Sequence, residues 1–92
     1  MRRYLATETF WKKFYGLPDE QKAQTREAWE IFKIDPFDPR LGTHRINVLS
    51  ARANRTVYAA VIAQDLRLTF YIEGNSVITV DIGSHAAEQS RR

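Results

Sequence analysis

The chain has 92 residues, 43% of them hydrophobic and 12% aromatic, and its formal charge at pH 7 is +3. This length supports one modest hydrophobic core, so we expect a single domain over residues 1–92. There is no cysteine and no apolar run near the roughly 20 residues that cross a bilayer, and Thr7, Glu8 and Thr9 interrupt any signal-peptide core. These features exclude disulfide scaffolds, thiolate metal sites and a membrane partner, and we expect a cytoplasmic protein.

The N-terminal third predicts a short strand and two helices. Residues 2–6 form a brief extended run, and Thr7-Glu8-Thr9 begins a helix. Its aromatic residues follow helical spacing and form one stripe that we expect in the core, namely Phe10, Trp11, Phe14 and Tyr15. Gly16-Leu17-Pro18 ends this helix and begins a second, which runs to about Ile34 because Pro36 disfavours helix in the residue before it. Two helices joined by so short a turn form an antiparallel hairpin that covers one face of a sheet.

A connector and a basic segment follow the helices. Residues 35–42 include two prolines, which indicates a fixed path. Residues 44–49 have a period of two and predict a strand, and residues 50–55 predict a basic loop that leads into the central strands.

Three further strands are predicted at residues 56–63, 66–72 and 77–82. In the middle run the apolar residues alternate with polar or aromatic ones. Its inward set is Leu66, Leu68, Phe70 and Ile72, and its outward set is Arg67, Thr69 and Tyr71. The inward set of the last run is Ile78, Val80 and Ile82. The intervening Glu73-Gly74-Asn75-Ser76 has turn chemistry, so the last two runs form an antiparallel hairpin.

The register of this hairpin follows from the two apolar sets, since opposed residues share a face. Both sets occupy even positions, so the loop must hold an odd number of residues, and we centre it on Asn75. The predicted pairs are Ile72 with Ile78, Leu68 with Ile82, Arg67 with Gly83, and Asp65 with His85. Gly83 then leaves room for the guanidinium of Arg67 or for a group that it holds. A two-residue Gly74-Asn75 turn would break this match, and a bulge would shift it by one residue.

Charge is distributed unevenly along the chain. Acidic residues gather at positions 19 to 38, whereas the chain from position 40 onward is rich in arginine: Arg40, Arg45, Arg52, Arg55, Arg67, Arg91 and Arg92. This bias predicts an electropositive sheet face or rim, which suits a polyanionic partner.

Four segments together resemble a known family. They are Asp65-Leu66-Arg67-Leu68-Thr69-Phe70, Ile82-Gly83-Ser84-His85-Ala86-Ala87, Phe10-Trp11-Lys12-Lys13 through Leu17-Pro18, and Asp35-Pro36. They resemble the RelE/ParE superfamily of bacterial type II toxin–antitoxin toxins and are most similar to its YafQ-like branch. The resemblance spans nearly the whole chain. It implies an α+β fold in which a two-helix N-terminal hairpin packs on a curved, mainly antiparallel sheet of three to five strands.

The resemblance also implies a function. Many members of the superfamily cut messenger RNA in the ribosomal A site without a metal, and each is silenced by an antitoxin. The expected partners are therefore mRNA, the 30S A site of the ribosome and a cognate antitoxin, and no cofactor is expected. By position, the catalytic set of the YafQ-like branch corresponds to His44, Asp65 and His85. Arg67 corresponds to the arginine with which RelE-like nucleases hold phosphate.

Departures from the family pattern leave alternatives open. Val61 stands where the YafQ-like branch has a further histidine, and Gln89 stands where it has an aromatic residue. Nothing after His85 supplies the C-terminal tyrosine of RelE. A ParE-like toxin that binds gyrase without nuclease activity, or a catalytically decayed domain that binds only its antitoxin, therefore remains an alternative.

The chemistry of RNA cleavage fits these residue types. Attack by the 2′-hydroxyl on the adjacent phosphate needs a base, an acid for the leaving 5′-oxygen, and positive charge at the phosphorane. Histidine titrates near neutrality, a carboxylate orients the ring, and arginine offers a planar fork. We further assign RNA or phosphate binding to Arg45, Arg52, Arg55 and Tyr71, although solvated loop charges and an exposed cross-strand tyrosine explain them as well. Two histidines do not make a metal site.

Overall fold

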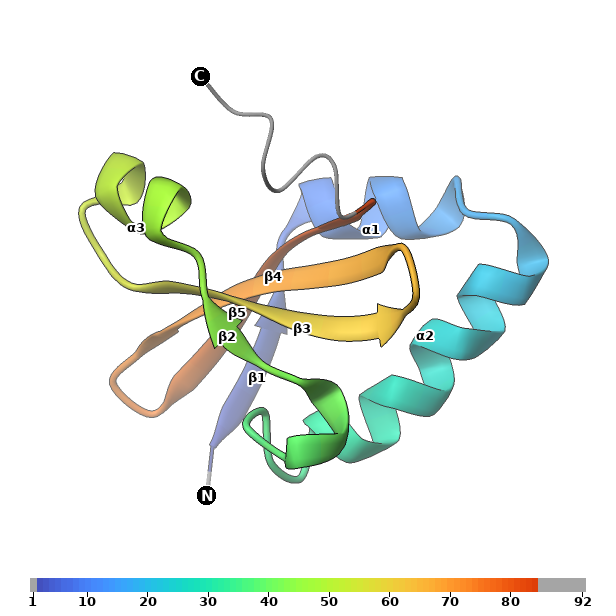
Figure 1. Cartoon of the computed structure of the whole chain (residues 1–92), viewed down its shortest axis with the longest axis horizontal. Helices are drawn as coiled ribbons and strands as arrows, with labels where there is room; N and C mark the ends of the chain where they lie inside the picture. Colours follow the sequence, from blue (N-terminus) through green and yellow to red (C-terminus); the bar gives the residue numbers. More distant parts are fainter. Residues whose placement is uncertain (1, 85–92) are drawn as a thin grey trace.

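A five-stranded sheet forms the centre of the molecule in the computed structural model, which describes residues 2–84 (Figure 1). The elements in chain order are β1 (Arg3–Ala6), α1 (Glu8–Tyr15), α2 (Asp19–Phe32), η1 (Pro39–Leu41), β2 (His44–Arg45), α3 (Asn47–Ala53), β3 (Val57–Ala63), β4 (Leu66–Glu73) and β5 (Ser76–Gly83). The strand order is β1-β5-β4-β3-β2, and only the β1–β5 pair is parallel. The predicted α+β fold with two N-terminal helices on a mainly antiparallel sheet is confirmed.

The two N-terminal helices begin and end close to the predicted residues. Thr7 is the N-cap of α1, because its Oγ1 accepts a hydrogen bond from the Phe10 amide at 3.2 Å. Pro18 precedes α2, and Asp19 and Glu20 lie in its first turn, where negative charge is favourable. Helix α1 packs on β5 and α2 packs on β3, so the same face of the sheet is covered by both.

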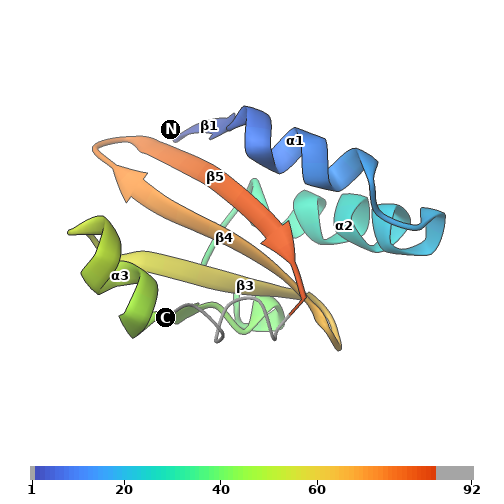
Figure 2. The same ribbon diagram turned by 90° about the horizontal axis from the view of Figure 1, so that it is seen from above.

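The main core lies between these helices and the sheet. Edge-to-face contact between Phe32 and Phe70, with ring centroids 4.9 Å apart, joins α2 to the central strand β4. The buried residues of this core are Phe10, Phe14, Ala28, Phe32, Leu41, Ala60, Leu66, Leu68, Phe70, Val77 and Ile82. A smaller cluster of Ile46, Val57 and Ala59 lies on the other face of the sheet, under α3, and Figure 2 shows α3 on the side away from α1.

The predicted strand over residues 44–49 and loop over 50–55 are wrong between residues 47 and 53, whereas the strand at 44–45 and the loop at 54–55 are confirmed. The strand stops after two residues, and α3 occupies Asn47–Ala53. Contacts with β3 explain α3, because Ile46 packs on Val57 and the Ser50 hydroxyl accepts a hydrogen bond from the Val57 backbone amide at 2.8 Å. Asn54 then ends α3 in the left-handed conformation, at φ 58°.

The β4–β5 hairpin departs from the predicted register at its turn and rejoins it at the far end. The turn has two residues, with Gly74 at φ 60° in the first central position, so Ile72 faces Val77 rather than Ile78. A bulge at Val80 then adds one residue to β5, and the predicted pairs Leu68–Ile82 and Arg67–Gly83 are confirmed. The predicted inward set of Ile78, Val80 and Ile82 is right only at Ile82, because the two-residue turn directs Val77 and Thr79 inward and the bulge then returns Ile82 to the core.

Candidate functional site

Most predicted site residues in the described part of the chain lie on or beside the sheet face that α1 and α2 leave uncovered (Figure 2). Paired residues of neighbouring strands share a face, so two cross-strand rows can be followed across the sheet. One row is Val61, Arg67 and Gly83. The adjacent row is His44, Ala59, Thr69 and Asp81. His44 and Arg67 therefore occupy neighbouring rows of the same face.

Arg67 bends back over the turn between β3 and β4. Its Nη1 donates hydrogen bonds to the carbonyl oxygens of Ala63 at 3.1 Å and Gln64 at 3.2 Å. Its Nε is buried and has no hydrogen-bond partner within the described residues. The guanidinium thus holds the turn that contains Asp65.

Gly83 provides open space opposite Arg67. A Cβ atom built on Gly83 would meet no atom of residues 2–84 within 4 Å, and Gly83 pairs with Arg67 across the hairpin. The Gly83 position, across the hairpin from Arg67, is therefore open toward the rest of the described chain.

Asp65 lies in the exposed turn that joins β3 to β4, two residues before Arg67. Its predicted partner, His85, lies outside the described residues, so the Asp65–His85 pairing stays a prediction. The last pair before it in the hairpin, Arg67 with Gly83, has the predicted register.

His44 is held at the edge of the sheet by a backbone carbonyl. Its Nδ1 lies 3.1 Å from the carbonyl oxygen of Gly42. A carbonyl only accepts, so this contact requires a proton on Nδ1, and in the neutral ring Nε2 is then the acceptor. Val61 fills the neighbouring position, since its Cγ2 would lie 3.4 Å from a Cβ on Gly42.

The four residues assigned to RNA or phosphate binding are only partly brought together. The guanidinium carbon of Arg55 lies 4.2 Å from the ring centroid of Tyr71, and its Nη1 lies 4.0 Å from Glu73 Oε1. Arg45 and Arg55 line one small polar pocket of about 280 Å³ formed by α3, the end of β2 and the loop that follows α3. Arg52 is exposed on the last turn of α3 and does not line this pocket.

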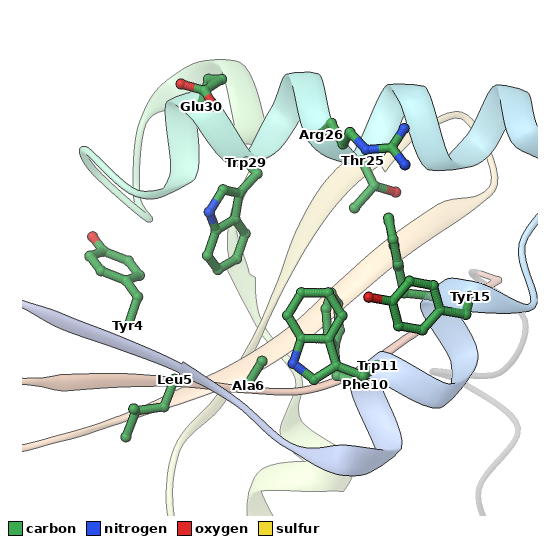
Figure 3. A pocket seen from close by; sticks show the side chains of 11 residues that line it. Tyr4, Leu5, Ala6, Phe10, Trp11, Tyr15, Thr25, Arg26, Trp29 and Glu30 are labelled. Carbon is green, nitrogen blue, oxygen red and sulfur yellow. The ribbon is translucent and has the colours of Figure 1, made fainter.

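A second surface feature was missed at the sequence level. An apolar groove of about 630 Å³ lies among β1, α1 and α2 (Figure 3). The prediction that the whole aromatic stripe of α1 is core is wrong, because Phe10 and Phe14 are buried whereas Trp11 is 45% and Tyr15 66% exposed. Their rings stack at 5.7 Å along the groove. The signal in the sequence is the spacing: Trp11 and Tyr15 lie one residue, or about 100°, away from the buried pair.

Two further observations concern the described residues as a set. They contain no group of three or more His, Cys, Asp or Glu side chains placed to hold a metal ion. None of their helices combines the length and the apolar character needed to cross a membrane.

Comparison with family models and with curated protein sequences finds no match to this chain. Solved structures do match its fold. A chain of the archaeal RelE–RelB complex from Pyrococcus horikoshii OT3 has a TM-score of 0.69 at 12% identity, covering 90% of this chain and 93% of that one. YafQ from E. coli strain BL21(DE3) has a TM-score of 0.69 at 13% identity, with coverages of 95% and 97%. The E. coli DinJ–YafQ complex gives 0.63 at 18% identity, with coverages of 95% and 97%.

These likenesses establish that the chain has the fold of RelE, YafQ, YoeB and ParE toxins. The fold implied by the family resemblance is therefore confirmed. YafQ structures are among the matches, but their TM-scores do not set them apart from the RelE and YoeB structures.

Proposed function

We propose that this chain is the toxin of a bacterial type II toxin–antitoxin system and that it cleaves ribosome-bound mRNA as a metal-independent endoribonuclease. The observation that supports this most is the pairing of Arg67 with Gly83, a position that is open toward residues 2–84, with Asp65 in the adjoining turn. A cation and a carboxylate thus lie two residues apart in the chain, and the cation is on the sheet face that His44 shares.

In the proposed reaction the 2′-hydroxyl attacks the adjacent phosphate and the 5′-oxygen leaves. His85, oriented by Asp65, and His44, through Nε2, are the acid and base. Arg67 stabilises the negative charge of the phosphorane through Nη2, while its Nη1 keeps the turn in place. No metal and no cofactor takes part.

The RNA strand on either side of the reacting phosphate is proposed to lie over the basic surface near α3. Arg45 and Arg55 line the polar pocket there and contribute phosphate contacts that weaken with salt. Tyr71 offers a stacking surface for a base once Arg55 moves off its ring. Arg52 adds positive charge nearby.

A cognate antitoxin is the proposed protein partner, and the groove among β1, α1 and α2 is its proposed docking site. Relatives of this fold were crystallised as RelE–RelB and DinJ–YafQ complexes. The exposed rings of Trp11 and Tyr15, with Leu5 45% exposed beside them, suit the apolar face of an amphipathic segment. Like its target, such a complex belongs in the cytoplasm.

The alternative is a ParE-like toxin that binds gyrase and cleaves nothing. One observation favours it, because both Nη1 hydrogen bonds of Arg67 go to backbone carbonyls and account for this arginine without RNA. In a catalytically decayed domain, Val61 beside Gly42 would likewise be a packing residue.

Induction of the protein in cells, followed by mapping of mRNA 5′ ends, separates these functions. We expect growth arrest with cuts at A-site codons that disappear when translation initiation is blocked. Arrest accompanied by DNA damage and intact mRNA would instead support the gyrase-binding alternative. Growth without arrest would support the decayed domain.

A further inference from the structure

The bulge in β5 decides which residue faces Arg67. Phe70 pairs with Thr79 but Thr69 pairs with Asp81, so Val80 is the extra residue. Without it, the register set by the two-residue turn would continue along the hairpin. Leu68 would then face Asp81 and Arg67 would face Ile82. The bulge instead puts Ile82 into the core and Gly83 opposite Arg67.

Helix α1 contacts every residue of this bulge. The Thr7 amide donates to the carbonyl oxygen of Thr79 at 2.9 Å, and Thr7 Oγ1 donates to the carbonyl oxygen of Val80 at 3.1 Å. Lys13 Nζ lies 3.0 Å from Asp81 Oδ1. We call these the α1–bulge contacts.

Asp81 links the last of these contacts to the strand end. Its Oδ1 also accepts a hydrogen bond from the Ile82 amide at 2.8 Å. Lys13 therefore fixes a carboxylate that in turn fixes the backbone of the residue next to Gly83. The ion pair itself is half exposed, with side chains 52% and 42% accessible, so its contribution to global stability is small.

We propose that Lys13 and Asp81 are positioning residues for the RNA cleavage assigned above: through the α1–bulge contacts they hold Gly83 opposite Arg67. This inference rests on the proposed function for its kinetic part. Neither side chain is required to touch RNA. Their effect is on the geometry of the strand end, and small errors of position in an active site lower the rate of the chemical step.

The decisive variant is Lys13→Met, which keeps the stem of the side chain and removes the charge. Lys13→Arg keeps the ion pair. Lys12→Met is the matched control, because Lys12 is exposed on the same helix and makes no ion pair with any described residue. Single-turnover cleavage of mRNA on programmed ribosomes gives the rate, its dependence on ribosome concentration gives the apparent KM, and thermal melting gives stability.

We expect Lys13→Met and Asp81→Asn to lower the single-turnover rate about tenfold, with little change in apparent KM or melting temperature. Lys13→Arg and Lys12→Met are expected to react at the wild-type rate. The proposal is overturned if Lys13→Met cleaves normally, or if Lys12→Met slows cleavage equally.

A second readout keeps this test independent of the proposed function. Cross-strand NOEs between Arg67 and Gly83 report the register directly by NMR. We expect them to weaken in Lys13→Met and to persist in Lys12→Met. If the wild type cleaves no RNA, the proposed function fails, and these NOEs alone decide whether Lys13 holds the strand end. Unchanged NOEs in Lys13→Met would then overturn the inference.

Discussion

Arg67 on β4 faces Gly83 on β5, and the Gly83 position is open enough that an added Cβ would meet no atom within 4 Å. Glycine is not required there by backbone strain, since Gly83 is not among the glycines with positive φ. No close neighbour among residues 2–84 requires it either. What distinguishes the position is the space at Gly83, across the hairpin from Arg67.

Filling this space is expected to block the site without unfolding the protein. Gly83→Leu extends a side chain over the Arg67 position, whereas Gly83→Ala adds a single methyl group. We expect both variants to melt within a few degrees of the wild type, because an added Cβ meets no atom of the described residues within 4 Å and the position is not buried. Cleavage of ribosome-bound mRNA should fall at least about tenfold in Gly83→Leu and little in Gly83→Ala. Equal activity of the two variants would mean that no ligand group enters this space.

Arg67 itself is predicted to have two separable roles. Arg67→Ala loses both hydrogen bonds to the β3–β4 turn, so we expect a loss of about 1 kcal/mol in the free energy of unfolding, and cleavage about 100-fold slower. Arg67→Lys retains a charge and a donor for the turn but not the planar fork, so it should recover stability and only part of the rate. Denaturant titration and single-turnover cleavage measure the two roles separately. Near-normal cleavage by folded Arg67→Ala would remove Arg67 from the site.

The Arg67–Gly83 pair was predicted correctly although the turn was not, because two differences between the predicted and the observed hairpin cancel. The predicted odd-numbered loop and the observed two-residue turn differ by one residue, and the bulge at Val80 restores that residue. The apolar pattern near Ile82 therefore gave the right register at the strand end and the wrong one near Ile78. A bulge depends on contacts from α1, which lie more than 60 residues away in the sequence and leave no local signal.

Helix α3 and the exposure of two α1 rings could not be predicted from sequence patterns either. Residues 47–49 read as strand because alternation over so few residues does not distinguish a strand from a short helix. The exposure of Trp11 and Tyr15 depends on how α2 lies relative to α1, which a pattern within α1 cannot reveal. In contrast, the helix ends at Gly16 and before Pro36 follow from local chemistry and were predicted to within two residues.

The groove among β1, α1 and α2 predicts where antitoxin binding will be sensitive to mutation. Tyr15→Ala and Trp11→Ala remove exposed rings from the groove. Each should therefore lower the affinity for the cognate antitoxin at least about tenfold, as measured by calorimetric titration. Ile34→Ala is the matched control, because Ile34 is 80% exposed but does not line the groove. Cleavage by the isolated toxin should be unchanged in all three. Antitoxin affinity that survives both ring deletions would exclude this groove as the docking site.

Glu73 is predicted to restrain RNA binding at the basic surface. Its carboxylate lies 4.0 Å from Arg55, which covers the ring of Tyr71. Glu73→Gln removes a negative charge and frees the guanidinium, so single-stranded RNA should bind about threefold more tightly. Arg55→Gln should bind single-stranded RNA several-fold less tightly. It should also lower the slope of the logarithm of the binding constant against the logarithm of salt concentration by about 0.7 in magnitude. Glu27→Gln, an exposed acid on α2, controls for net charge. The assignment of Arg55 to RNA fails if all three variants shift affinity by the change in net charge alone.

The chain has two histidines, His44 and His85. They are therefore the only imidazole side chains that could serve as acid and base in the proposed reaction. His85→Ala should relieve growth arrest while the protein stays folded, because it removes one of the two proton-transfer groups, and the cleavage rate should fall roughly 100-fold or more.

For His44 the contact with Gly42 allows a finer test. His44→Asn can still donate to the Gly42 carbonyl in place of Nδ1 but lacks Nε2, whereas His44→Gln extends an amide toward the Nε2 position. If Nε2 acts as base, both variants lose cleavage and one limb of the pH–rate profile, and His44→Asn melts like the wild type. If His44 only fixes the edge of the sheet, His44→Asn keeps the wild-type rate and both limbs. Persistent toxicity of folded His85→Ala and His44→Asn together would leave the gyrase-binding alternative as the better account, because binding to gyrase needs neither an acid nor a base.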